Sequence, residues 1–161
     1  MARWSGNQNT FTPVAVADTT NMTSGGYCAL QGGSSTQRIN CLEFFLGGQA
    51  TSSTVNQVAI ARDSTVAATL SGGTNAALDP ASAALGAPAV FFSTASTAPK
   101  RSATLYLLSP SFNAFGGIVR WVAAPGEEIG MLGNTASFGE VSISTLAGTG
   151  PMSAHIIFEV F

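Results

Sequence analysis

Charged side chains are scarce in this sequence. Only 9% of the residues are Asp, Glu, Lys or Arg, whereas about a quarter is usual in soluble domains. The basic residues are scattered and the formal net charge is −2, so the chain lacks the basic footprint of a nucleic-acid-binding protein. Long apolar runs are missing too. Those near 42–46 and 156–161 are short and contain glutamate, which argues against a membrane-spanning segment.

Residues able to form a catalytic or metal site are equally few. His155 is the only histidine, and the chain has no Gly-x-Ser-x-Gly motif to present a nucleophile. Cys28, Cys41 and His155 match no zinc-binding spacing, and no calcium loop or phosphate-binding loop is present. The paired carboxyl groups of a glycosidase could come from Glu127, Glu128, Glu140 and Glu159. Glu127 and Glu128 follow Pro-Gly, however, where an exposed turn explains them better. We therefore predict a protein that is not an enzyme, with no catalytic residues, no metal site and no cofactor.

The N-terminal residues lack the apolar stretch and cleavage site of a secretory signal. We therefore expect the chain to be made and used without secretion, with Cys28 and Cys41 as buried thiols. Residues 1–10 are polar apart from Trp4, which predicts an N-terminal arm that becomes ordered on binding, with Trp4 as its anchor. Residues 11–161 are long enough to form one domain with its own core.

Small uncharged residues take the place of the missing charges. Ala, Ser, Thr and Gly together make up nearly half of the chain. A surface of such residues costs little to desolvate, and Lys and Glu are depleted in the cores of protein interfaces. A free monomer usually keeps more charge for solubility. The composition favours a subunit whose surface is covered in an assembly, and a small soluble Ser/Thr-rich domain is the alternative.

Short β-favouring runs separated by turn residues recur along the whole chain. They cover residues 11–17, 27–30, 38–46, 55–62, 89–93, 104–108, 117–123, 129–133, 140–146 and 155–161. Residues 79–86 carry a cap residue, Pro at the first helical position and Gly at the stop, which predicts one short helix. The pattern predicts an all-β chain folded as a two-sheet antiparallel β-sandwich of the jelly-roll kind. An immunoglobulin topology is the alternative, although no Cys-Trp-Cys spacing supports it.

Four residues are candidates for contacts with other protein chains: Trp4, Arg62, Asp63 and Arg120. Arg62 and Asp63 are adjacent opposite charges in a charge-poor chain, and they fit either a subunit contact or a pair that caps a loop. Arg120 and Trp121 place a guanidinium and an indole on opposite faces of one strand. Both residue types are enriched at interface hot spots, although a tryptophan there also fits the core.

The segment from Ser111 to Glu128 resembles a recurring pattern in small structural proteins of tailed phages, as do the shorter stretches 61–66, 132–134 and 140–142. In size, composition and inferred sandwich fold the chain resembles the decoration, or cement, proteins of phage heads. The resemblance implies a virion protein made in the host cytoplasm that binds the outer capsid surface and stiffens the shell. Its implied partners are the major capsid protein and further copies of itself, often as trimers, and it names no catalytic residue.

Two other functions fit the sequence. One is a different virion component, such as a fibre, a baseplate part or a jelly-roll shell subunit. The other is a carbohydrate-binding module, which would need exposed aromatic side chains as platforms. Trp4, Tyr27, Tyr106 and Trp121 are the candidates besides phenylalanine.

Overall fold

The structure is a computed structural model that describes residues 2–81, 90–133 and 139–161. Within these residues the chain is all-β and its strands pair antiparallel, which confirms the all-β, antiparallel part of the predicted fold. The strands are β1 (Arg3–Phe11), β2 (Cys28–Gln31), β3 (Arg38–Gly48), β4 (Val55–Thr65), β5 (Ala68–Ser71), β6 (Thr74–Ala77), β7 (Val90–Phe92), β8 (Thr94–Thr97), β9 (Lys100–Leu108), β10 (Ser111–Asn113), β11 (Ile118–Val122), β12 (Ile129–Leu132), β13 (Glu140–Ala147) and β14 (Met152–Val160). No helix in the described part is long and apolar enough to cross a membrane.

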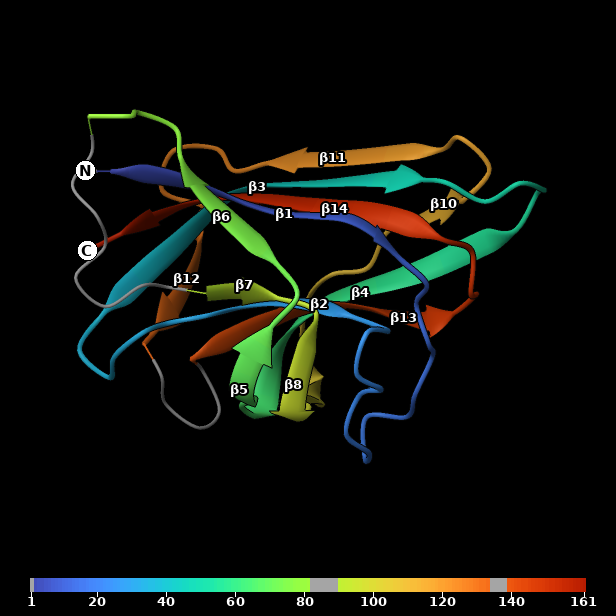
Figure 1. Ribbon diagram of the computed structural model, residues 1–161, viewed down its shortest axis with the longest axis horizontal. Coiled ribbons are helices and arrows are strands. Elements are labelled where there is room, and N and C mark those ends of the chain that lie inside the picture. Colours follow the sequence, from blue (N-terminus) through green and yellow to red (C-terminus); the bar gives the residue numbers. More distant parts are fainter. Residues whose placement is uncertain (1, 82–89, 134–138) are drawn as a thin grey trace.

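Two six-stranded sheets lie one above the other in a sandwich-like arrangement (Figure 1). Sheet A has the order β11-β3-β14-β1-β6, and β12 pairs with the first part of β3. Sheet B has the order β10-β4-β13-β2-β7, and β9 pairs with β4. The strands β5 and β8 form a separate pair, which lies below sheet B in Figure 1, on the side away from sheet A.

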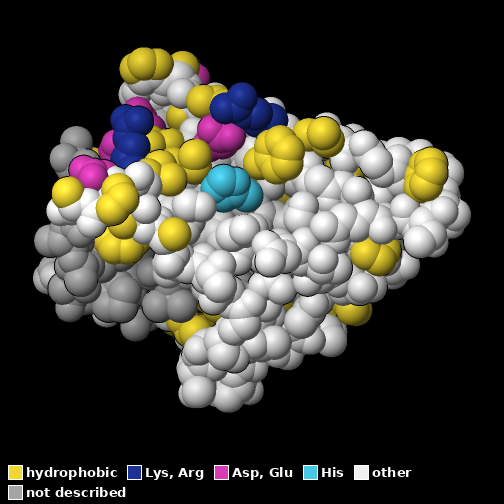
Figure 2. All heavy atoms as spheres, turned by 45° about the horizontal axis from the view of Figure 1, so that its top comes forward, with side chains coloured by type: hydrophobic (Ala, Val, Ile, Leu, Met, Phe, Trp, Pro, Cys, Tyr) yellow, Lys and Arg dark blue, Asp and Glu magenta, His cyan; other side chains and the backbone are white. Residues whose placement is uncertain are grey.

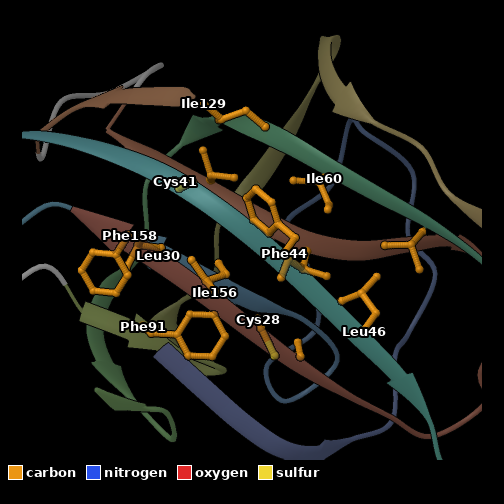
Figure 3. Packing of buried hydrophobic residues seen from close by; sticks show 14 of the residues in the cluster. Cys28, Leu30, Cys41, Phe44, Leu46, Ile60, Phe91, Ile129, Ile156 and Phe158 are labelled. Carbon is orange, nitrogen blue, oxygen red and sulfur yellow. The ribbon is translucent and has the colours of Figure 1, made fainter. Parts of the chain in front are cut away.

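The main core fills the space between sheets A and B, where apolar side chains from both sheets point toward one another (Figure 3). In β14 the alternation of residue types decides the faces. Met152, Ala154, Ile156 and Phe158 are buried, whereas His155 between them is partly exposed. Such a period of two is the pattern of a strand with one face on a core.

The core-facing residues of β3 change from odd to even sequence positions along the strand, and a β-bulge at Leu42 explains the change. The pairing with β14 shifts there, because Ile157 lies opposite Glu43 and Phe158 lies opposite Cys41. Cys41 and Phe44 are three residues apart, yet both face the core. One extra residue in a strand reverses the faces of everything that follows it.

The two cysteines are free and buried in the main core, as the sequence predicts. Figure 3 shows Cys28 and Cys41 among aromatic and aliphatic side chains. Burial raises the pKa of Cys41 to about 12 and raises that of Cys28 as well. Both side chains therefore remain thiols and act as small apolar groups.

A smaller apolar cluster lies on the outer side of sheet B. It consists of the buried residues Met22, Tyr27, Ala29, Ala67 and Phe92, against which side chains of the segment 12–27, β5 and β8 pack. We call the segment 12–27 together with residues 67–71 and 94–98 the cover. Because of the cover, sheet B is buried on both faces: Val141, Ser142, Ile143 and Ser144 are all buried in β13. The sequence alone, in which Val141 and Ile143 alternate with Ser142 and Ser144, instead predicts one exposed face for this strand.

The N-terminal segment differs from its prediction as an arm. Residues 3–11 form β1, which lies between β14 and β6 inside sheet A. At Gly6 the strand has no side chain, and Phe91 of β7 packs against the backbone there. Phe11 at the end of β1 is buried in the main core. Trp4 packs on the main core. Polar residues thus form a central strand here because the neighbouring layer supplies the apolar contact.

Two further expectations differ from the structure or fall outside it. Residues 12–17, predicted as part of a strand, have no regular structure and belong to the cover. Pro13 gives the physical reason, because proline cannot donate a ladder hydrogen bond. The short helix predicted over 79–86 lies mostly outside the described residues; its first part, Asp79–Ala81, forms a bend and turn in which the Ala81 N–H donates to Asp79 Oδ1 over 2.9 Å.

Candidate functional site

The outer face of sheet A carries two ion pairs. Arg120 of β11 donates to both carboxylate oxygens of Glu43 on β3, over 2.8 and 3.1 Å. Arg3 of β1 donates to Glu159 of β14 over 2.8 Å. The hydrogen bond from Arg120 holds the pKa of Glu43 below its usual range. On the face shown in Figure 2 the charged groups gather toward one end, and most of the rest of that face is uncharged.

One edge of sheet A is apolar. In the described part of the chain β11 pairs with β3 alone, so the other side of its backbone lies at the sheet edge. The exposed side chains along β11, β12 and the turn before them form what we call the apolar edge: Phe115, Ile118, Val122 and Leu132, each between 54% and 67% exposed. Natural edge strands usually avoid such side chains because a free apolar edge pairs readily with another chain.

An apolar cavity of about 350 Å³ opens between the two sheets beside β11. Its walls are Phe44, Leu46, Ile60, Leu108, Ser109, Pro110, Val119, Arg120 and Trp121. The Trp121 ring lies 5.7 Å from that of Phe44, centroid to centroid, so the indole joins the core and the cavity wall at once. A space of this size and character accepts an apolar side chain of a partner or a small apolar molecule.

A serine and the only histidine lie together on the outer face of sheet A. Ser5 Oγ of β1 is 2.8 Å from His155 Nε2 of β14, which is the separation of a nucleophile and its base in hydrolases. Catalysis also needs donors for a developing oxyanion and a cleft that excludes water. Neither side chain lines the apolar cavity. We therefore interpret this contact as a hydrogen bond that ties β1 to β14.

Beneath the cover, polar side chains are buried on the outer face of sheet B. Asp63 of β4 and Glu140 of β13 are both 0% exposed. The Ser142 hydroxyl donates to Asp63 Oδ1 over 2.6 Å. The Gln31 amide and the Ala67 backbone N–H donate to Glu140 Oε2, each over 2.9 Å. One oxygen of each carboxyl group, Asp63 Oδ2 and Glu140 Oε1, has no donor.

These two carboxyl groups are neighbours across the strand pair. Val141 lies opposite Arg62 in the antiparallel register, so the next pair along the strands is Glu140 and Asp63. Burial raises the pKa of Glu140 to about 7 and, together with the nearby Glu140, raises the pKa of Asp63 well above its usual range. Two neighbouring buried carboxyl groups do not both ionise, because like charges in a medium of low polarity repel strongly.

A buried arginine belongs to the same layer. The side chain of Arg101 in β9 is 1% exposed, and its Nε donates to Asp18 Oδ1 over 2.8 Å. Its other nitrogens donate to Ser144 Oγ, over 2.7 Å, and to the backbone oxygens of Thr145 and Val16. Partial burial of Asp18 opposes its ionisation, but hydrogen bonds from Tyr106 and Arg101 outweigh this and lower its pKa. Arg101 thereby joins the segment 12–27 to β13.

The structure separates the four residues predicted to contact partners. Arg120 lies on the accessible edge of sheet A, whereas Trp4 is half-buried against the core. Arg62 donates to the backbone oxygen of Gly130 in β12 over 2.8 Å. Asp63, on the other face of the same strand, is buried and hydrogen-bonded to Ser142. This burial fits neither a subunit contact nor a loop cap at Asp63. Arg62 and Asp63 differ in this way because adjacent residues of a strand point to opposite sides.

The sequence reasoning missed Glu140, Arg101, Gln31 and Tyr27 as members of a buried cluster. Their polarity resembles that of an exposed strand face, and the cover that buries them is built from distant segments. Of the four aromatic residues considered as sugar platforms, Tyr27 is fully buried and Tyr106 is 37% exposed, while Trp4 and Trp121 are half-buried.

The chain matches no protein-family model, and no curated protein is significantly similar to it.

Proposed function

We propose that this protein is a non-enzymatic structural subunit of a virion, specifically a decoration protein that binds the outer surface of a phage capsid. The apolar edge carries the proposal. Phe115, Ile118 and Val122 lie within the segment 111–128 whose pattern resembles phage structural proteins. They are exposed on a chain with too few charges to favour a free monomer. In this proposal the apolar edge is the surface that meets the major capsid protein.

The physical requirements of such a contact fit the edge. A stable interface buries about 1,200–2,000 Å², which needs a broad surface rather than a single pocket. A flat sheet edge beside small uncharged residues is cheap to desolvate. The apolar cavity next to β11 would accept one anchoring side chain of the capsid protein. Many symmetric copies then add modest affinities through avidity, and contacts between copies, as in a trimer, increase the effect.

The finer fold prediction, a jelly-roll topology, is part of the same proposal. It rests on the two stacked antiparallel sheets and on the frequency of jelly rolls among viral structural proteins. A different virion part, such as a fibre, baseplate or shell subunit, remains the alternative function, because the same apolar edge would serve an interface in any of them.

The proposal is tested by mixing purified protein with expanded capsids that lack it and counting the bound copies by mass. Saturation at a number set by the capsid lattice is the expected result. Binding only at a vertex or at the tail would favour the alternative virion component. No binding at all would overturn the decoration function.

Matched variants locate the surface. Ile118→Asp and Val122→Asp place a charge on the apolar edge, and because both residues are exposed, folding should be preserved. We expect capsid binding to weaken at least tenfold, since a buried unpaired charge is costly in an interface. Val55→Asp is the control, because Val55 is 62% exposed but lies in β4 of sheet B. Equal losses in all three variants would show that the apolar edge is not the binding surface.

A further inference from the structure

The buried polar cluster attaches the cover to sheet B at two points. At the first point Glu140 accepts the N–H of Ala67, and Gln31 donates to the Ala67 oxygen over 3.0 Å. Ala67 directly precedes β5. At the second point Arg101 binds Val16 and Asp18 of the segment 12–27. The cover is therefore held on sheet B by polar contacts in addition to its own apolar residues.

The apolar part of this attachment is small. Among the described residues, five buried residues form the cluster between the cover and sheet B, whereas nineteen form the core between the two sheets. Regions with little buried apolar surface open at a lower free energy than the core of the same domain. The polar contacts consequently decide how firmly the cover stays closed.

The two donor-free oxygens explain one another. Asp63 Oδ2 and Glu140 Oε1 are buried and lack any donor, and their residues are cross-strand neighbours. A buried acceptor without a donor is costly. A single proton between the two oxygens satisfies both and leaves one negative charge instead of two, as in carboxyl pairs that share a proton.

We propose that Asp63 and Glu140 share one buried proton, and that this proton holds the cover closed: when it is lost, the cover opens while the two-sheet core remains folded. The direction of the pKa shifts of both residues agrees with this arrangement. Loss of the proton leaves two negative charges beside each other under the cover. Opening the cover relieves them, because it admits water to Glu140 and releases Ala67.

The charged and titratable groups near Asp63 and Glu140 come from the segment 12–27, from β2 and from β9. Tyr27, which precedes β2, is buried beside both carboxyl groups, and they help to raise its pKa. Arg101 of β9 attracts the charge of Asp63, but its own hydrogen bonds go to Asp18, Ser144, Thr145 and Val16. Cys28 points into the other side of sheet B. Arg101 thus does not replace the shared proton.

Hydrogen exchange of the whole chain tests the proposal. Exchange is followed between pH 5.5 and 9 and corrected for the intrinsic effect of pH. Protection in 12–27 and 67–71 should fall above neutral pH, by up to about tenfold per pH unit for one released proton. Protection in β3 and β14 should decline only with the global stability and remain high at pH 9, where the cover should have lost its protection. Complete loss of protection throughout the chain, or no loss in the cover, would overturn the proposal.

Two variants replace the proton by a permanent N–H group. Asp63→Asn and Glu140→Gln keep the shape of the side chain and offer an amide donor to the remaining carboxyl group. Either variant should keep the cover protected from pH 5.5 to 9. Glu43→Gln is the control, because Glu43 lies on the outer face of sheet A, and it should retain the pH dependence of the unchanged protein. If both amide variants still lose protection in the cover above neutral pH, the shared proton does not hold the cover closed.

A spectroscopic measurement addresses the proton directly and does not depend on how the variants fold. The infrared band of a protonated carboxyl group should persist in the unchanged protein at pH 6, where ordinary carboxyl groups are ionised. It should disappear as the cover opens. Absence of the band at pH 6, or a metal ion retained by the protein in native mass spectra, would contradict a shared proton.

Discussion

Gly6 of β1 lies directly against Phe91 of β7, so close that a Cβ atom on Gly6 would stand 2.7 Å from the Cβ of Phe91. The contact joins sheet A to sheet B at a point where both residues are buried. Only a residue without a side chain fits between the β1 backbone and the ring. This close approach, together with the core contacts of Trp4 and Phe11, places the otherwise polar strand β1 on the core.

Replacement of Gly6 should therefore destabilise the protein. We expect Gly6→Ala to lower the free energy of unfolding by about 1–3 kcal/mol, because the added methyl group forces Phe91 or β1 to move. Urea denaturation measures the loss. Gly130→Ala is the control, since a Cβ there meets only the ends of the flexible Arg38 and Asn40 side chains at 3.5 Å. A similar loss in both variants would contradict the explanation.

Removal of Arg101 should loosen the cover and destabilise the protein. In Arg101→Leu, Ser144 loses its donor and Asp18 loses its cationic partner. We expect the free energy of unfolding to fall by about 2–4 kcal/mol, because breaking a buried ion pair leaves its remaining partner without compensation. Arg3→Leu is the matched control: its ion pair with Glu159 has an arginine side chain that is 61% exposed, so a loss below about 1 kcal/mol is expected. Equal losses would show that burial does not distinguish the two pairs.

Stability should be greatest in mildly acidic solution. The pKa of Glu140 rises from 4.5 to about 7 on folding, so the folded chain holds the proton more tightly than the unfolded chain. This contribution is complete below about pH 4.5 and is lost as the pH rises through about 7, at a cost on the order of 2–3 kcal/mol.

Asp18 and Glu43 act in the opposite direction, since their pKa values are lowered and their contributions are lost only below about pH 4. Unfolding midpoints in urea from pH 3 to 9 test the whole profile. Glu140→Gln should flatten the decline above pH 5 and leave the acid side unchanged. A maximum at pH 8 or above in the unchanged protein would refute the assignment.

Both thiols should be unreactive in the folded protein. Cys28 and Cys41 are 0% exposed, and the raised pKa of Cys41, about 12, leaves almost no thiolate at pH 8. A thiol reagent at pH 8 should therefore modify two groups in urea and fewer than one in buffer over the same time. Rapid modification of either cysteine in buffer would mean that the main core opens. The modification rates also distinguish opening of the main core from opening of the cover, because opening of the cover alone does not expose the core side of sheet B.

Periodic apolar residues made most strands of the sandwich predictable from the sequence. The runs 38–46 and 140–146 coincide with β3 and β13, since side chains such as Ile143 alternate in the manner of a strand with a core face. The strand β1 could not be recognised from the sequence, because its burial depends on the contact between Gly6 and Phe91, which are 85 positions apart. No local sequence pattern indicates this contact.

The candidate surface and the buried cluster differ in how far the sequence announces them. Arg120 was singled out because arginine is enriched at interface hot spots, and it does lie on the accessible face of sheet A. Asp63 attracted attention as one of two adjacent opposite charges in a charge-poor chain, yet it is buried beneath the cover. Composition marks a charged residue as unusual, but only the packing of distant segments decides whether it meets solvent, a partner or another buried acid.

The bulge at Leu42 makes β3 two half-strands in opposite phase. The first half pairs with β12 and the second with β11, and each presents its apolar residues inward only because one residue between them is skipped. Deletion of Leu42 would remove only the extra residue, and Cys41, Phe44 and Leu46 would then all face the core in unbroken alternation. The bulge can therefore absorb the loss of one residue, whereas a residue lost elsewhere in β3 would reverse the faces of the residues beyond it.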